Sequence, residues 1–137
     1  MNETEKLILG EYIRDYSVSD ISYKVMGKML DEDYVERRLK MFDINEMYIY
    51  GGSYMAVQLY RIGGKFTVVR DIVDKSGQIV LNNLVPVITL DEFRKKYNGE
   101  KVIIASIRFF QEIREELKLF VNSNDIIGIG ELLLGIA

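Results

Sequence analysis

The fold of this chain is decided by the stretch Met47-Tyr48-Ile49-Tyr50-Gly51-Gly52-Ser53-Tyr54. Its first four residues are apolar or aromatic and favour a short β-strand, and the two glycines end that strand. From Tyr54 to Ile62 the apolar residues return at helical spacing, and Gly63 stands where a helix commonly closes. The stretch therefore predicts a buried strand that turns tightly into a helix.

The alternation of strand and helix continues to the C-terminus. Strands are expected at 66–73, 84–88, 101–106 and 125–127, and helices at 90–97, 109–120 and the apolar end of the chain. The segment 101–106 contains a continuous apolar run, which is typical of a central parallel strand covered on both faces. Strands that alternate with helices imply right-handed crossovers and a parallel sheet. We therefore predict a three-layer, Rossmann-like α/β fold with about five strands.

The first 45 residues follow a helical pattern instead. Helices are expected at 5–16, 21–30 and 34–42, with a break at Ser17-Val18-Ser19-Asp20 and with Asp31 or Asp33 capping the third helix. No proline and no glycine-serine run separates this part from the rest. We expect a helical extension over residues 1–45 and one nucleotide-binding domain over residues 46–137.

Composition excludes several kinds of chemistry. The chain has 137 residues, 48% of them hydrophobic, which suits one compact domain. It contains no cysteine and no histidine, so disulfides, thiolate metal sites, cysteine nucleophiles and Ser-His-Asp chemistry are excluded from this chain alone. We expect no metal cofactor.

Charge and hydropathy indicate the partners to be expected. Acidic and basic residues are interspersed, with a net charge of -3, whereas nucleic-acid binding favours a concentrated basic stripe. No apolar run reaches the roughly 18 residues that span a bilayer, and the first six residues are unlike a secretory signal. We therefore expect a soluble cytoplasmic protein that binds neither nucleic acid nor membrane.

The glycine turn predicts a binding site for phosphate. In dinucleotide-binding domains the first strand ends in a G-x-G-x-x-G turn, which lets a phosphate approach backbone N–H groups at the start of the next helix. Here the turn reads Gly51-x-Ser53-x-x-Ala56. Gly51 supplies the tight turn, Gly52 can offset the serine, and Ala56 still permits close helix–strand packing. A purely structural role for the glycines is the alternative.

An acid at the end of the second strand commonly receives ribose hydroxyls, about 20 residues after the glycines. Asp74 stands at about that distance and is the first candidate, with Asp71 the second. An ordinary turn aspartate is the alternative. Lys75 can meet a phosphate or remain solvated, and Tyr54 at the helix start can stack on a base.

The order of these landmarks resembles a known group of domains. The segment Tyr48–Tyr54 resembles the "iyGaG" turn of small Rossmann-like domains in bacterial sugar-nucleotide and surface-polysaccharide enzymes. Those domains occur as nucleoside-diphosphate-sugar epimerases or dehydratases, at the N-terminus of sugar acyltransferases and at the C-terminus of sugar C-methyltransferases. Segments 72–75, 85–93 and 102–117 resemble their later landmarks, so the similarity covers roughly Met47 to Phe120.

This resemblance implies a ligand and the residues that hold it. The ligand would be a nucleoside-diphosphate sugar or NAD(P), gripped by Gly51, Gly52, Ser53 and Tyr54, by Asp74 and Lys75, and by Ala105 and Ser106 at the end of the fourth strand.

No catalytic residue is assigned. Tyr97 and Lys101 have the Tyr-x-x-x-Lys spacing of short-chain sugar epimerases, but Asn98-Gly99 breaks the helix between them, so chance spacing is the better explanation. We expect a ligand-binding domain without complete catalytic machinery. The alternatives are a scaffold that has lost its ligand, and an enzyme completed by a partner chain. In either case a homo-oligomer would form through the N-terminal helices or the apolar tail Leu132–Ala137.

Overall fold

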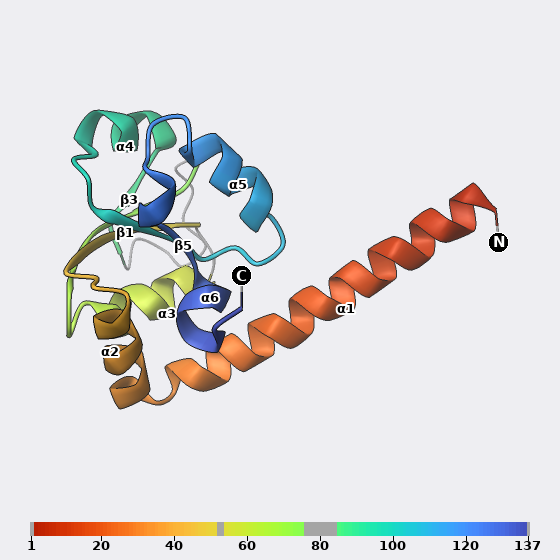
Figure 1. Cartoon of the computed structure of the whole chain (residues 1–137), viewed down its shortest axis with the longest axis horizontal. Coiled ribbons are helices and arrows are strands. Elements are labelled where there is room, and N and C mark those ends of the chain that lie inside the picture. The colour runs from red at the N-terminus through yellow and green to blue at the C-terminus, as the bar shows by residue number, and fades with distance from the viewer. Residues whose placement is uncertain (1, 52–53, 76–84, 137) are drawn as a thin grey trace.

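The computed structural model describes residues 2–51, 54–75 and 85–136, and its architecture is a parallel sheet between two layers of helices (Figure 1). This confirms the predicted α/β fold class. Its elements in chain order are α1 (Glu3–Met29), α2 (Glu32–Met41), β1 (Glu46–Tyr50), α3 (Tyr54–Gly63), β2 (Val68–Val73), β3 (Val87–Ile88), α4 (Leu90–Lys96), β4 (Lys101–Ile104), α5 (Phe110–Leu117), the 3-10 turn η1 (Ser123–Asp125), β5 (Ile126–Gly128) and α6 (Ile129–Leu134).

The described strands form one sheet in the order β3-β2-β1-β4-β5, and every pair is parallel. β1 is central: Tyr50 stands opposite Val73 of β2 and Ile104 of β4, so these three strands end level with one another. The chain builds β2 and β3 on one side of β1 and then crosses to the other side for β4 and β5. The order therefore reverses between β1 and β4, which is where open α/β sheets bind ligands.

Alternating side chains of β1 fill two separate cores. Met47 and Ile49 pack toward α1, α2, α3 and α6, whereas Tyr48 and Tyr50 pack toward α4 and α5. All four side chains are buried. A strand covered on both faces needs apolar residues at successive positions, which explains why this segment is so uniformly apolar.

The N-terminal extension corrects one prediction. The break expected at Ser17–Asp20 is wrong, because α1 is one continuous helix of 27 residues. Serine and aspartate cost a helix interior only about 0.5 kcal/mol each, and Ile21 and Val25 anchor the following turns on the domain. The first half of α1 extends away from the domain (Figure 1). Across the described segments, no helix is both long enough and apolar enough to cross a bilayer.

The apolar C-terminus packs inside this chain. Leu132 and Leu133 are fully buried. Arg38 on α2 donates from Nε to the Leu132 carbonyl at 2.6 Å and from Nη2 to the Glu131 carbonyl at 3.2 Å, and the Tyr34 hydroxyl donates to the Leu133 carbonyl at 2.5 Å. The last turn of α6 would otherwise leave these carbonyls without partners. Docking on α2 therefore explains the apolar tail.

We expect Arg38→Met to lower the free energy of unfolding by about 1.5–3 kcal/mol, because it removes charge-assisted hydrogen bonds to partly buried carbonyls. Urea denaturation followed by circular dichroism measures this. The control is Lys40→Met on the same helix, whose ion pair with Glu36 is solvent-exposed and should matter by less than about 1 kcal/mol. Equal losses for both variants would show that the bonds to α6 contribute nothing.

Candidate functional site

A cavity of about 490 Å³ opens at the carboxyl ends of β1 and β4. Five of the residues predicted from the sequence line it together: Gly51, Tyr54, Asp74, Ala105 and Ser106. They come from three segments that are separate in sequence, and the parallel sheet brings these to one edge. We call this cavity the crevice.

Three other predicted residues do not contribute to the described crevice. Gly52 and Ser53 lie outside the described residues. Lys75 is absent from the lining, and its Nζ lies 3.5 Å from Glu116 Oε1 on α5. The second acidic candidate, Asp71, is also elsewhere, with its carboxylate 3.8 Å from Lys96 Nζ of α4. Asp74 is therefore the acid that reaches the crevice.

Gly51 ends β1 in a conformation that favours glycine. Its N–H still donates to the Val73 carbonyl at 2.8 Å, but its φ is +128°. A Cβ at this position would lie 3.8 Å from the carbonyl carbon of Ala105, which is ordinary contact, so backbone conformation and not space requires glycine. Tyr54 and Met55, at the start of α3, line the crevice beside it. The first N–H groups of a helix have no intrahelical partner and carry a partial positive charge.

The end of β4 forms the opposite side of the crevice. The Ala105 N–H donates to the Tyr50 carbonyl at 2.9 Å, so the ladder continues to this point. Ser106 Oγ then accepts the Phe109 N–H at 3.2 Å and closes the turn that leads into α5. The small side chains of Ala105 and Ser106 leave this part of the crevice open.

α1 covers the crevice, which the sequence analysis did not anticipate. Val18, Ser22 and Met26 line it, and their four-residue spacing puts them on one face of the helix. This four-residue spacing is visible in the sequence, but the helix break predicted at Ser17–Asp20 interrupts it.

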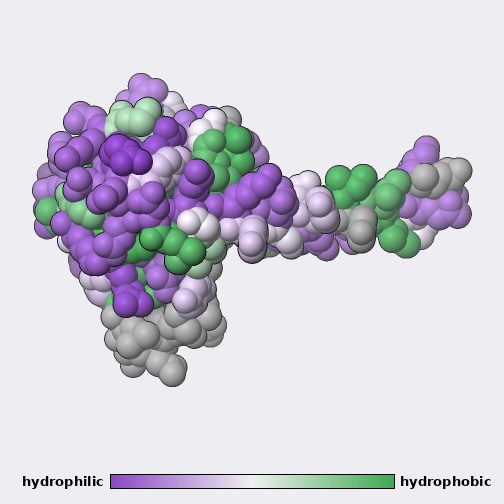
Figure 2. All heavy atoms as spheres, turned by 90° about the horizontal axis from the view of Figure 1, so that it is seen from below, coloured by the Kyte–Doolittle hydropathy of each residue, from purple (hydrophilic) through white to green (hydrophobic). Residues whose placement is uncertain are grey.

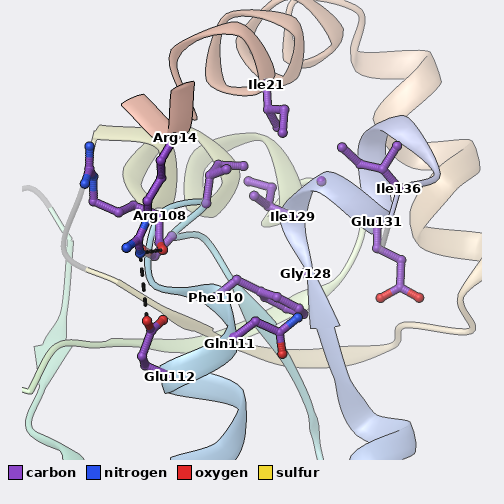
Figure 3. A pocket seen from close by; sticks show the side chains of 13 residues that line it. Arg14, Ile21, Arg108, Phe110, Gln111, Glu112, Gly128, Ile129, Glu131 and Ile136 are labelled. Carbon is purple, nitrogen blue, oxygen red and sulfur yellow. Dashed lines mark hydrogen bonds and ion pairs between the residues drawn. The ribbon is translucent and has the colours of Figure 1, made fainter. Parts of the chain in front are cut away.

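Polar contacts attach α1 to the loop between β4 and α5. Arg14 Nη2 donates to the Arg108 carbonyl at 2.8 Å and lies 3.8 Å from Glu112 Oε1, the contact drawn in Figure 3. Arg108 in turn forms an ion pair with Asp15. Arg108 lines the crevice, so this attachment lies at its rim.

A second cavity of about 340 Å³ adjoins the crevice and shares Ser106, Ile107 and Arg108 with it. In Figure 3 Ile21 of α1 and Ile129 of α6 line its middle, and the Phe110 ring lies against Gly128. A Cβ on Gly128 would approach Phe110 Cε2 to 2.8 Å, so this close packing requires glycine. The two cavities extend the free space along the underside of α1.

Tyr50, which lines the crevice, has a raised pKa that makes it unsuited to proton transfer. Burial, together with the nearby carboxylates Glu116 and Asp74, raises the pKa of Tyr50 to about 12. Tyr50 lines the crevice but stays protonated at neutral pH, so it can position a ligand and is a poor base.

The Tyr97 and Lys101 spacing makes no catalytic pair. Tyr97 packs against Phe93, with ring centroids 5.4 Å apart, and burial raises its pKa to about 12, whereas a catalytic pair needs a lowered one. Lys101 starts β4 and lies 3.0 Å from Asp125 Oδ1. Both belong to the amino edge of the sheet, away from the crevice. Within the described ranges, no three acidic side chains gather closely enough to hold a metal ion.

We expect Gly51→Ala to destabilise the protein by about 1–3 kcal/mol, because alanine rarely adopts its backbone conformation. Chemical denaturation measures the loss. Gly10→Ala is the control: Gly10 lies in the exposed part of α1 with open space around it, so alanine should stabilise the helix. If Gly51→Ala left the free energy of unfolding unchanged, the backbone of this turn would not be held in a conformation that favours glycine.

Raising the pH from 10 to 12 should lower the free energy of unfolding, because Tyr50 loses its proton more readily in the unfolded chain than in the folded protein. Its pKa in the folded protein, about 12, lies above the ordinary tyrosine value of 10.0, so the unfolded chain loses this proton first and stability falls across that window. One such group contributes a slope of at most about 1.4 kcal/mol per pH unit. Urea midpoints should therefore fall less steeply for Tyr50→Phe than for the wild type. Identical slopes for Tyr50→Phe and the wild type would refute the assignment.

No protein-family model, curated protein or solved structure matches this chain. The resemblance to domains of sugar-nucleotide enzymes therefore rests on the sequence motifs alone.

Proposed function

We propose that the crevice binds a nucleotide-type ligand, either a nucleoside-diphosphate sugar or NAD(P). One observation carries this proposal: residues selected from sequence motifs in three separate segments line one cavity at the point where the strand order reverses. Ligands of open α/β sheets bind at that point, because the loops on either side diverge there and leave a crevice. The sequence resemblance favours a role in bacterial surface-polysaccharide metabolism.

Each part of a nucleotide has a counterpart in the crevice. The start of α3 and the turn at Gly51 suit a phosphate, because a helix N-terminus presents N–H groups and partial positive charge. The Asp74 carboxylate suits ribose hydroxyls. Tyr54 is 52% exposed at the mouth, and its ring is available to stack on a base. Met26 of α1 adds an apolar wall.

The charge balance supports a second candidate, a scaffold without ligand. Arg108 is the one basic side chain in the described lining, and Asp15 of α1 already neutralises it. A phosphate would have to compete with Asp15 for the guanidinium. If the ion pair persists, the described lining offers an anion uncharged donors: backbone N–H groups and the hydroxyls of its serines and tyrosines.

Thermal unfolding with a ligand panel distinguishes the two candidates. The panel contains UDP-glucose, NAD+, NADP+, S-adenosylmethionine and coenzyme A. A ligand present at about 100 times its dissociation constant stabilises a protein by about 2.7 kcal/mol, which is a rise in Tm on the order of 10 °C for a domain of this size. We expect such a rise with the sugar nucleotide or a nicotinamide dinucleotide.

Ser106→Asp tests whether the stabilising ligand occupies the crevice. Aspartate keeps an acceptor for the Phe109 N–H, so the turn is preserved, but it adds a negative charge where a phosphate would approach. We expect at least tenfold weaker binding. Ser123→Asp in η1, at the opposite edge of the sheet, is the matched control and should bind like the wild type. A flat panel would support the scaffold, and binding unaffected by Ser106→Asp would move the ligand out of the crevice.

A further inference from the structure

α1 has two apolar faces, and the domain covers only one of them. Val25 and Met29 are buried against the domain. On the opposite side lie four large apolar residues spaced seven apart: Leu9, Tyr16, Tyr23 and Leu30, which follows the last residue of the helix. They are 44%, 68%, 81% and 87% exposed, and Ile13 beside them is 55% exposed. We call these five residues the outer stripe.

The projecting half of α1 gains little from the domain. Every side chain described before Val18 is exposed, and Figure 2 shows hydrophobic side chains near the free end of the helix. An isolated helical segment of 12–15 residues is marginal in water. A partner along the outer stripe would therefore stabilise this half.

The seven-residue repeat indicates what that partner is. Apolar residues spaced by heptads lie along one side of an α-helix and supply one of the two positions in each heptad at which helices of a coiled coil pack together. α1 is about 40 Å long, so the stripe offers a seam that a second helix of the same length can follow. A second copy of this chain supplies such a helix with the same stripe, and a two-fold axis makes the contact self-complementary.

Charge decides the orientation of the two helices. The first half of α1 is acidic, with Glu3, Glu5, Glu11 and Asp15 against Lys6 and Arg14, whereas the second half carries Lys24 and Lys28 against Asp20. A parallel pair would set the two acidic halves side by side. An antiparallel pair sets each acidic half against a basic one and opposes the helix dipoles.

We propose that α1 pairs with α1 of a second copy in an antiparallel coiled coil centred on Tyr16. Leu9 then lies across from Tyr23 of the second copy. The two domains lie at opposite ends of the paired helices, and each keeps its own crevice. This inference does not depend on ligand binding.

Sedimentation equilibrium of the full chain tests the pairing. We expect a dimer at micromolar concentration, and at least 100-fold weaker dimerisation for the double variant Leu9→Lys/Tyr16→Lys. Leu119→Lys is the matched control, because Leu119 is 76% exposed but lies on the domain. Near-ultraviolet circular dichroism checks that the domain of each variant remains folded. A monomeric wild type, or a dimer that survives the double variant, would overturn the proposal.

Cysteine cross-linking tests the orientation, since the natural chain has no cysteine. An antiparallel pair predicts that Leu9→Cys and Tyr23→Cys proteins, when mixed and oxidised, form the mixed disulfide much faster than either protein forms a disulfide with itself. A parallel pair predicts the reverse, so rapid self-linking of Leu9→Cys would refute the antiparallel arrangement. Leu119→Cys, which should not cross-link at a comparable rate, controls for random collision.

Discussion

The hydrogen bonding of β1 on both edges is the constraint on which the rest of the structure depends. β2 and β4 both pair with it in parallel, so the carboxyl ends of all three strands meet at one edge of the sheet. Segments that are distant in sequence, after Tyr50, Val73 and Ile104, therefore converge there. Gly51 lets the backbone turn out of β1 at this edge, because its positive φ is a conformation that other residues rarely adopt. An edge position for β1 would separate these segments and leave no crevice.

α1 gives this simple sheet an additional feature. Its second half covers the crevice through Val18, Ser22 and Met26, and the polar contacts of Arg14 and Asp15 attach it to the loop after β4. Its described side chains before Arg14 are all exposed. One helix therefore links the site with a surface for a second copy. The turn that holds Arg108 lies beside the proposed crossing point at Tyr16, so pairing and ligand binding would meet at adjacent residues.

Features that depend on local periodicity could be predicted from the sequence, whereas features that depend on tertiary contacts could not. The short apolar strand at Met47–Tyr50 and Asp31 as the N-cap of α2 are local signals, and the structure confirms both of them. The continuity of α1 through Ser17–Asp20 is not local, because contacts of the following turns with the domain outweigh a weak propensity. The convergence of Gly51, Asp74 and Ser106 could be predicted, because the order of the strands determines it. The ion pair between Lys75 and Glu116 could not, because it depends on the position of α5.

The central claim is that an anionic nucleotide lies against the backbone at the carboxyl ends of β1 and β4. Amide chemical shifts of ¹⁵N-labelled protein, measured during titration with UDP-glucose and with NAD+, test it most directly. We expect saturable shifts at Gly51, Tyr54, Ala105 and Ser106 for one of these ligands, and little change at the amino edge around Gly99. No saturable shift with either ligand, or the largest shifts around Gly99, would contradict it.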